Sequence, residues 1–189
     1  MKGKMKEILI PTVALFIICL ISTALLGGTN SLTSEKIKQV AAESAAKART
    51  LVLTQATDFE ESKITVEDTE YTYYIGKDAN GEAVGYTVTT QDKSYGGTIE
   101  VMTGFDLDGK ITGVEILTID DTPGLGMNAK NDSFRNEYVG KSGELTVSKT
   151  ASADNEIQAI TGATITSKAV TRCVNLASTI VSQAKGGAN

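Results

Sequence analysis

A short segment near the end of the chain gathers hydroxyl side chains in front of a predicted helix. It reads Ile160-Thr161-Gly162-Ala163-Thr164-Ile165-Thr166-Ser167. Gly162 and Ala163 add almost no bulk beside Thr164, so a second enzyme could reach its hydroxyl, and the free N–H groups and positive dipole of the following helix would favour a phosphate there. Threonine also caps helices often, and on physical grounds alone a cap formed by Thr164 or Thr166 is the commoner arrangement.

A second segment, Asp121-Thr122-Pro123-Gly124-Leu125-Gly126, combines a turn with closely spaced glycines. The Pro123-Gly124 pair sets the turn. Gly124 and Gly126 let the backbone approach a flat ring closely, because glycine has no side chain. Taken alone, the segment also fits an ordinary loop turn.

The overall composition excludes several classes of function. With 23 acidic and 18 basic residues among 189, the formal net charge is −5, so the chain lacks the basic face that nucleic-acid binding requires. It has no histidine, which excludes Ser-His-Asp and Cys-His catalysis within the chain. Cys19 lies in an apolar run and Cys173 in a helical pattern, which predicts neither a disulfide nor a metal site.

An uncharged apolar run of about 19 residues, from Ile8 to Leu26, predicts a transmembrane helix. Lys2, Lys4 and Lys6 precede it, so the positive-inside rule places the N-terminus in the cytoplasm and the rest of the chain on the extracytoplasmic side of the cell membrane. A cleaved signal peptide is the alternative, although this run is longer than a usual signal-peptide core.

The residues after the apolar run predict a break and then a second helix. Gly27-Gly28-Thr29-Asn30 would end the first helix, and Thr33 or Ser34 would cap the next, whose apolar residues recur at helical spacing up to Val52. We therefore expect three parts. Residues 1–27 form a cytoplasmic N-terminus and transmembrane anchor, residues 28–56 a linker and helix, and residues 57–189 the extracytoplasmic domain.

Two hairpins are the clearest local signals in the outer domain. The first turns at Asn80-Gly81 between strands at 71–75 and 84–89. The second turns at Asp108-Gly109 between strands at 99–105 and 111–118. A shortened calcium loop is conceivable at either turn, but no acidic residue follows at the spacing that would close it.

A short strand at 144–147 and a helix from about Thr166 to Ala184 complete the predicted elements. Strands and helices alternate loosely and the strands pair mostly antiparallel. The predicted fold class is therefore α+β, with an N-terminal transmembrane helix followed by one mostly antiparallel α+β domain.

Three segments resemble the FMN-binding domain family, in the right order along the chain. Thr161-Gly162-Ala163-Thr164 matches its Ser/Thr-Gly-Ala-Thr flavinylation motif. The segment 95–100 is similar to its Gly-Tyr-x-Gly motif, and the segment 121–126 to its Glu-Thr-Pro-Gly-Leu-Gly loop. Asp121 replaces the usual glutamate, and Gln158 stands where the family often has aspartate. With the N-terminal anchor, the resemblance covers nearly the whole chain.

The resemblance implies a flavoprotein with FMN attached covalently, through its phosphate, to Thr164. It also implies that two segments surround the flavin: Thr161, Gly162, Ala163, Thr166, Thr122, Pro123, Gly124, Leu125 and Gly126. No catalytic side chain and no metal are expected, because the flavin itself performs the redox chemistry. The residues from 57 onwards would then be the FMN-binding domain.

The family includes the G subunit of the Rnf complex and the C subunit of the sodium-pumping NADH:quinone oxidoreductase, and the shortness of this chain favours the first. The resemblance then implies an electron-carrying subunit of a membrane-bound, ion-translocating ferredoxin:NAD oxidoreductase. Its partners would be integral-membrane and iron-sulfur subunits, with a flavin transferase for maturation. Two alternatives stay open: a stand-alone flavinylated extracellular electron-transfer protein, and a membrane-tethered binding or structural module without cofactor.

Overall fold

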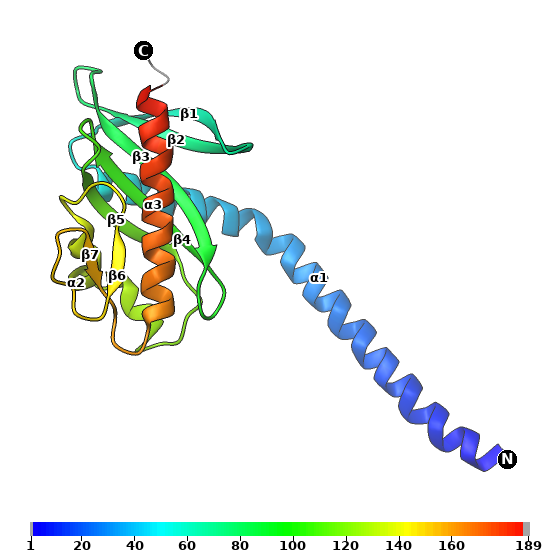
Figure 1. The fold of residues 1–189 in the computed structure, drawn as a ribbon. Coiled ribbons are helices and arrows are strands. Elements are labelled where there is room, and N and C mark those ends of the chain that lie inside the picture. Colours follow the sequence, from blue (N-terminus) through cyan, green and yellow to red (C-terminus); the bar gives the residue numbers. More distant parts are fainter. Residues whose placement is uncertain (1, 187–189) are drawn as a thin grey trace. The chain divides into compact units, whose positions relative to one another are not determined.

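The computed structural model describes the backbone of residues 2–186 and the side chains of residues 8–186. The chain divides into two compact units, Met1–Glu43 and Ser44–Asn189. Helix α1 (Lys2–Val52) makes up the described part of the first unit and opens the second. The second unit contains the sheet and the C-terminal helix (Figure 1).

Helix α1 runs without interruption through the four residues that predict a break. The predicted break at Gly27-Gly28-Thr29-Asn30 is therefore wrong. A glycine costs a helix only about 1 kcal/mol relative to alanine, so two glycines weaken the helix without ending it. The predicted caps are also wrong. The Thr33 hydroxyl donates to the Thr29 carbonyl oxygen at 2.9 Å and the Ser34 hydroxyl to the Ser31 carbonyl oxygen at 3.3 Å, both within the helix.

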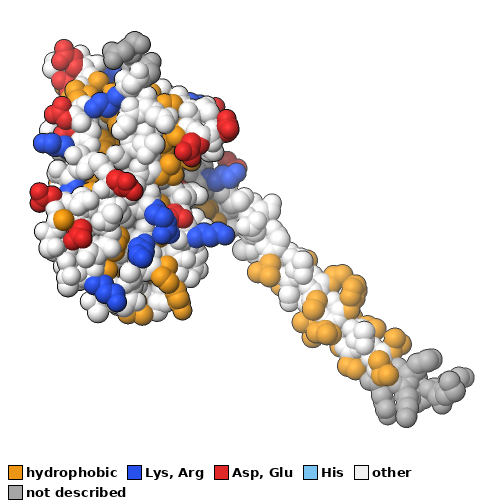
Figure 2. All heavy atoms as spheres, viewed as in Figure 1, with side chains coloured by type: hydrophobic (Ala, Val, Ile, Leu, Met, Phe, Trp, Pro, Cys, Tyr) orange, Lys and Arg blue, Asp and Glu red, His pale blue; other side chains and the backbone are white. Residues whose placement is uncertain are grey.

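By length and composition, one described helix, Ile8–Val52, could cross a membrane. The large apolar side chains from Ile8 to Leu26 are exposed: Ile8, Phe16 and Leu26 are 66–73% exposed. Figure 2 shows apolar side chains around this part of α1. A helix that is apolar all round matches a membrane span better than an amphipathic surface helix.

Five antiparallel strands form the main sheet in the order of the sequence. They are β1 (Asp58–Val66), β2 (Thr69–Lys77), β3 (Ala83–Lys93), β4 (Thr98–Asp106) and β5 (Ile111–Thr118). The four strands predicted around the two turns correspond to β2 through β5. Both predicted turns are present, with Gly81 at φ +83° and Gly109 at φ +89°, so the antiparallel α+β fold is confirmed.

Strand β1 has no counterpart among the predicted strands. It pairs with β2 through a two-residue turn at Glu67 and Asp68, whose φ angles are +47° and +63°. Such a turn needs left-handed backbone at both central residues and normally uses Asn-Gly or Asp-Gly. Glu-Asp gives no such signal in the sequence, so the hairpin was missed.

The connection from the sheet to the last helix is mostly short helical turns. It contains η1 (Gly126–Lys130), α2 (Asp132–Arg135) and η2 (Asn136–Tyr138), followed by β6 (Thr146–Ser148) and β7 (Glu156–Gln158). Strand β6 overlaps the strand predicted at 144–147. Its parallel partner β7 was not predicted, because three residues carry no periodicity.

Helix α3 (Thr164–Gly186) lies across one face of the sheet and forms the main core with it (Figure 1). It begins two residues before the predicted start and ends two residues after the predicted end. Ile99, Val101 and Phe105 of β4 are buried beneath it. The Thr90 hydroxyl of β3 donates to the Cys173 carbonyl oxygen at 2.9 Å. Burial raises the pKa of the Cys173 thiol to about 12, so this cysteine is a protonated packing residue.

The other face of the sheet is covered by the last residues of α1 and the residues that follow it. One glycine in each of four neighbouring strands makes room for them: Gly76, Gly85, Gly104 and Gly113. A Cβ atom on Gly85 would lie 2.9 Å from Leu53 Cδ1, and one on Gly113 would lie 2.9 Å from Val52 Cα. The end of α1 therefore packs directly on sheet backbone.

Candidate functional site

The residues before α3 form a tight turn that makes Thr164 the first residue of the helix. The Ala163 N–H donates to the Ile160 carbonyl oxygen at 2.9 Å, and Gly162 in this turn has φ +76°, which glycine adopts without strain. The first helical bond runs from the Ser167 N–H to the Ala163 carbonyl oxygen at 3.0 Å. The residues of the first turn thus keep N–H groups without a carbonyl partner in the helix.

The three threonines of the segment lie in different environments. Thr166 is 1% exposed, and its hydroxyl donates to Asp121 Oδ2 at 2.5 Å, so it does not cap the helix. Thr161 is exposed and precedes the helix. Thr164 is half-buried, and its hydroxyl makes no hydrogen bond to any of the residues that the structure describes. Thr164 therefore has a reactive group that the fold does not use.

Asp121 joins the three segments on which the family resemblance rests. Its Oδ1 accepts the Gly96 N–H at 2.6 Å, and its Oδ2 accepts the Ser94 and Thr166 hydroxyls, both at 2.5 Å. The β3–β4 turn, the loop after β5 and the start of α3 thus meet at one carboxylate. The side chain is 3% exposed and has no ion-pair partner within the described residues.

The charge of Asp121 is maintained by its hydrogen bonds. Burial by itself would raise the pKa of this carboxyl, but the donors from Ser94, Thr166 and Gly96 together outweigh burial and hold the pKa below its ordinary value of 3.8. Gly126 packs against the same group. A Cβ atom there would lie 2.5 Å from Asp121 Oδ2 and 2.6 Å from Thr166 Oγ1, so only glycine fits.

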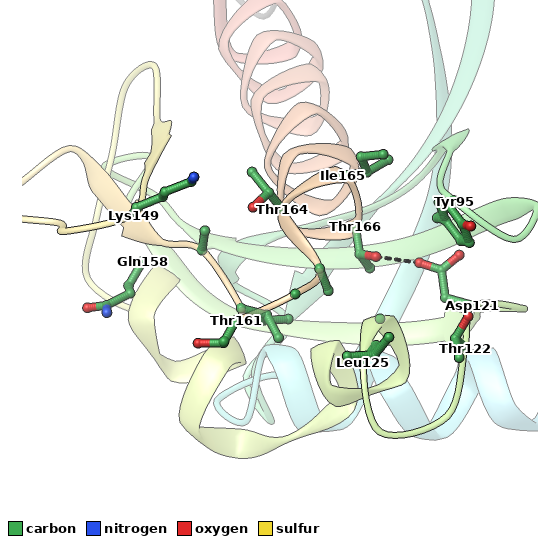
Figure 3. Close-up of a pocket in the computed structure, with 15 residues that line it drawn as sticks. Tyr95, Asp121, Thr122, Leu125, Lys149, Gln158, Thr161, Thr164, Ile165 and Thr166 are labelled. Atoms are coloured by element: carbon green, nitrogen blue, oxygen red, sulfur yellow. Dashed lines mark hydrogen bonds between the residues drawn. The ribbon is translucent and has the colours of Figure 1, made fainter.

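These segments enclose a cavity of about 680 Å³ at the start of α3 (Figure 3). Its polar wall includes the first-turn threonines, while Leu125 and Ile165, 44% and 55% exposed, and Tyr95, 72% exposed, add apolar surface. Pockets of 300–1,000 Å³ with mostly apolar walls and a few convergent polar groups are typical of small-molecule and cofactor sites. The cavity is therefore of cofactor size.

Most residues that sequence reasoning placed around a flavin line this cavity: Thr161, Gly162, Ala163, Thr164, Thr166, Thr122, Leu125 and Gly126. Pro123 and Gly124 do not line it. They form the outer turn of the loop, where Gly124 has φ +77°.

Several cavity-lining residues were not predicted as site residues: Tyr95, Asp121, Lys149, Gln158, Ala159, Ile160 and Ile165. Lys149 follows β6 and comes close only through the β6–β7 pairing, so its position gives no local sequence signal. Asp121 sits in a motif that was recognised, but its three hydrogen-bond donors come from distant segments.

Within the described residues, no group of three or more cysteine, aspartate and glutamate side chains could hold a metal ion. Cys19 and Cys173 are both free.

Comparison with known proteins identifies the two parts of the chain. The FMN-binding domain family model matches residues 94–179, which contain the cavity-lining segments on both sides of Asp121. The RnfG N-terminal region matches residues 1–52, a range that includes α1. The chain is 43% identical over 179 residues to the G subunit of the Na(+)-translocating ferredoxin:NAD(+) oxidoreductase complex of Acetobacterium woodii, covering 86% of each chain.

The chain belongs to the G-subunit family of ion-translocating oxidoreductase complexes. It is also 43% identical over 116 residues to the G subunit of the proton-translocating ferredoxin:NAD(+) oxidoreductase complex of Clostridium ljungdahlii, covering 61% of this chain and 62% of that one. Among solved structures, Shewanella oneidensis NqrC shares the fold, with a TM-score of 0.51 at 19% identity and 66% coverage of each chain.

The residues of the cavity fit the FMN of this family. The volume suits a flavin mononucleotide, and the free first-turn N–H groups beside the unbonded Thr164 hydroxyl suit its phosphate. The apolar surfaces of Leu125, Ile165 and Tyr95 suit an aromatic ring.

Proposed function

We propose that the chain carries FMN covalently, as a phosphodiester between the FMN phosphate and the Thr164 hydroxyl. The observation that supports this most directly is the state of that hydroxyl. It lies in the cavity on the first helical residue, partly exposed and without a hydrogen-bond partner among the residues whose side chains the structure describes. Thr166 is a poor acceptor, because it is buried and its proton is donated to Asp121.

The bound FMN supplies the capacity to accept and release electrons. The residues of the chain hold and orient it. The N–H groups and dipole of the α3 first turn stabilise the phosphodiester charge. The turn at Gly162 leaves the attachment point open to the transferase, and the Asp121 hydrogen bonds fix the opposite wall. Covalent attachment keeps the cofactor in place where free FMN would diffuse away.

We propose that the chain is the electron-carrying subunit of an ion-translocating ferredoxin:NAD oxidoreductase complex, with integral-membrane and iron-sulfur subunits as partners. The relatives named above support this assignment. Two of them, each 43% identical to this chain, translocate different ions according to their names. This pattern suits a subunit that carries electrons and leaves the choice of ion to others. The α1 span, with Cys19 as its only ionisable residue between Ile8 and Leu26, offers no ion path.

We place the FMN domain on the extracytoplasmic side of the cell membrane, because Lys2, Lys4 and Lys6 precede the apolar run. A cysteine introduced at Asp108, in the exposed β4–β5 turn, tests this orientation. An impermeant maleimide added to intact cells should label Asp108→Cys. Labelling only after the cells are lysed would indicate the opposite orientation, with the domain in the cytoplasm.

The attachment is tested by intact mass and peptide mapping of the denatured full-length protein, produced together with a flavin transferase. The expected result is a mass increase of one esterified FMN on the Thr164 peptide, absent in Thr164→Ala and retained in Thr164→Ser. Thr179→Ala, at an exposed threonine of α3 outside the cavity, is the matched control and should stay modified. An unmodified wild-type protein, or FMN on Thr161, would contradict the proposal.

Co-purification separates the complex subunit from a stand-alone carrier. Full-length protein tagged at its C-terminus and solubilised in mild detergent should bring down membrane and iron-sulfur subunits in fixed ratio. A flavinylated protein that purifies alone would support the stand-alone carrier, and a colourless one the tethered module.

A further inference from the structure

The cavity at the start of α3 is lined by two charged side chains of opposite sign. Among the described residues that line it, only Asp121 and Lys149 carry a charge at neutral pH. In Figure 3 they lie on opposite sides of the first turn of α3, with Thr164 between them, and the Lys149 amine points toward that turn. They come from separate segments, the loop after β5 and the residue after β6.

The two charges differ in their surroundings. Asp121 is 3% exposed and fixed by three hydrogen bonds of 2.5–2.6 Å. Lys149 is exposed, and it makes no ion pair with any described residue. Neither charge is neutralised by a partner of opposite sign, so each acts on whatever occupies the cavity. Solvent and salt screen an exposed charge far more than a buried one.

Resting on the proposed attachment of FMN to Thr164, we propose that Asp121 and Lys149 set the reduction potential of the flavin in opposite directions. Asp121 makes the flavin harder to reduce, and Lys149 makes it easier to reduce. Both are tuning residues that act through the electrostatic field in the cavity.

The direction follows from the charge balance of the reaction. Uptake of two electrons and one proton, with the electrons supplied by an electrode, adds one negative charge to the isoalloxazine ring. A fixed carboxylate near the ring disfavours the added charge, and an ammonium group favours it. Removing the Asp121 charge should therefore raise the potential, and removing the Lys149 charge should lower it.

The sizes of the two effects should also differ. A unit charge near the ring should change the equilibrium constant for reduction by roughly three- to tenfold, which for a two-electron couple is roughly 15–30 mV. The buried Asp121 should give the larger change, nearly independent of salt. The exposed Lys149 should give a change at low salt that largely disappears at about 1 M salt, where the Debye length is about 3 Å.

The experiment is a redox titration of full-length protein in detergent, followed by flavin absorbance, after intact mass has shown one FMN per chain. The variants are Lys149→Gln and Asp121→Asn. Each variant has a control that changes the net charge by the same amount in the β4–β5 turn, at the end of β4 away from the cavity. Lys110→Gln is the control for Lys149→Gln, and Asp108→Asn is the control for Asp121→Asn. The expected result is a lower potential for Lys149→Gln, a higher one for Asp121→Asn and no shift for either control.

The opposite signs separate an electrostatic effect from structural damage, because a distorted or more open cavity has no reason to shift the two variants in opposite directions. Shifts of the same sign, shifts equal to those of the controls, or unchanged potentials would overturn the proposal. If Asp121→Asn does not fold, the two variants at the exposed Lys149 still test the proposal. The charge reversal Lys149→Glu should shift the reduction potential twice as far as Lys149→Gln. Protein without covalent FMN on Thr164 would instead overturn the proposed function.

Discussion

Two neighbouring residues of β4 show that the faces of the sheet are packed in opposite ways. Phe105 is fully buried in the core under α3, where apolar side chains fill the space. Gly104 faces the end of α1, where a side chain has no room because the Val52 carbonyl oxygen lies against the glycine. Packing on the α3 face requires large side chains, and packing on the α1 face requires residues without a side chain.

This difference bears on how the site is supported. The α3 face holds the helix whose first turn carries Thr164. The other face holds the final residues of α1, and the Thr112 hydroxyl of β5 donates to the Val52 carbonyl oxygen there at 2.5 Å. Strand β4 contributes residues to both faces. Substitutions at its adjacent residues should therefore destabilise the fold for opposite physical reasons.

The largest expected effect is on the filled face. Phe105→Ala should lower the free energy of unfolding by about 3–5 kcal/mol, because it removes buried area and leaves a cavity under α3. Chemical denaturation of full-length protein in detergent, followed by near-UV circular dichroism, measures this loss. Phe105→Leu should recover part of it. Equal losses for the two variants would argue against a volume effect.

On the opposite face, one methyl group added to a sheet glycine should be enough to destabilise the fold. Gly104→Ala should cost about 3 kcal/mol, at the upper end for overpacking, since its Cβ would meet backbone and lie 2.7 Å from Thr112 Oγ1. Gly97→Ala is the matched control, because its Cβ would make only ordinary contacts of 3.6 Å with Asp120. A variant at Gly104 as stable as that control would refute the close packing of α1 on the sheet.

The sequence predicts the strands of the sheet better than it predicts the close packing of α1 against the sheet glycines. Asn80-Gly81 and Asp108-Gly109 predict the strands on both sides of them, because their turn chemistry is local. The role of Gly104 depends on the Val52 backbone, which lies about fifty positions earlier in the chain, so no pattern around Gly104 indicates it. The glycines at 27 and 28 show the reverse error. They predict a helix end, but helical hydrogen bonding continues through them.

The candidate site shows the same limit. Thr164 and its neighbours could be found from one contiguous motif. Lys149 could not, because only the fold brings it to the cavity. The three donors to Asp121 likewise come together through tertiary structure, from residues 25 to 45 positions away.

A smaller effect is expected where charge holds the site together. Asp121→Asn should lower the free energy of unfolding at pH 7 by about 2 kcal/mol, since hydrogen bonds to an ionised group are lost and an amide NH2 at the Oδ2 position cannot accept from the Ser94 and Thr166 hydroxyls. The folded-state pKa lies below 3.8, so the carboxylate stabilises the fold above about pH 4. That contribution is lost as the pH falls through the folded-state pKa.

Unfolding measured between pH 7 and pH 3 checks this expectation. The stability gap between wild type and Asp121→Asn should narrow below about pH 4. Ser94→Ala removes one donor and keeps the charge, so it should show a smaller gap. A gap that stays constant into acid would mean that Asp121 is not ionised in the folded protein.

The smallest effect on stability is expected at the residue with the largest proposed effect on function. Thr164→Ala should change the free energy of unfolding of the FMN-free protein by less than about 0.5 kcal/mol, because the hydroxyl has no partner among the described residues and alanine suits a first helical turn. Thr166→Val, which removes the bond to Asp121, should cost more. Both are compared by denaturation of protein produced without a flavin transferase. If Thr164→Ala instead costs about 1 kcal/mol or more, as loss of a helix cap does, the hydroxyl has a structural role. A near-neutral Thr164→Ala that also abolishes flavinylation would separate attachment from folding at this residue.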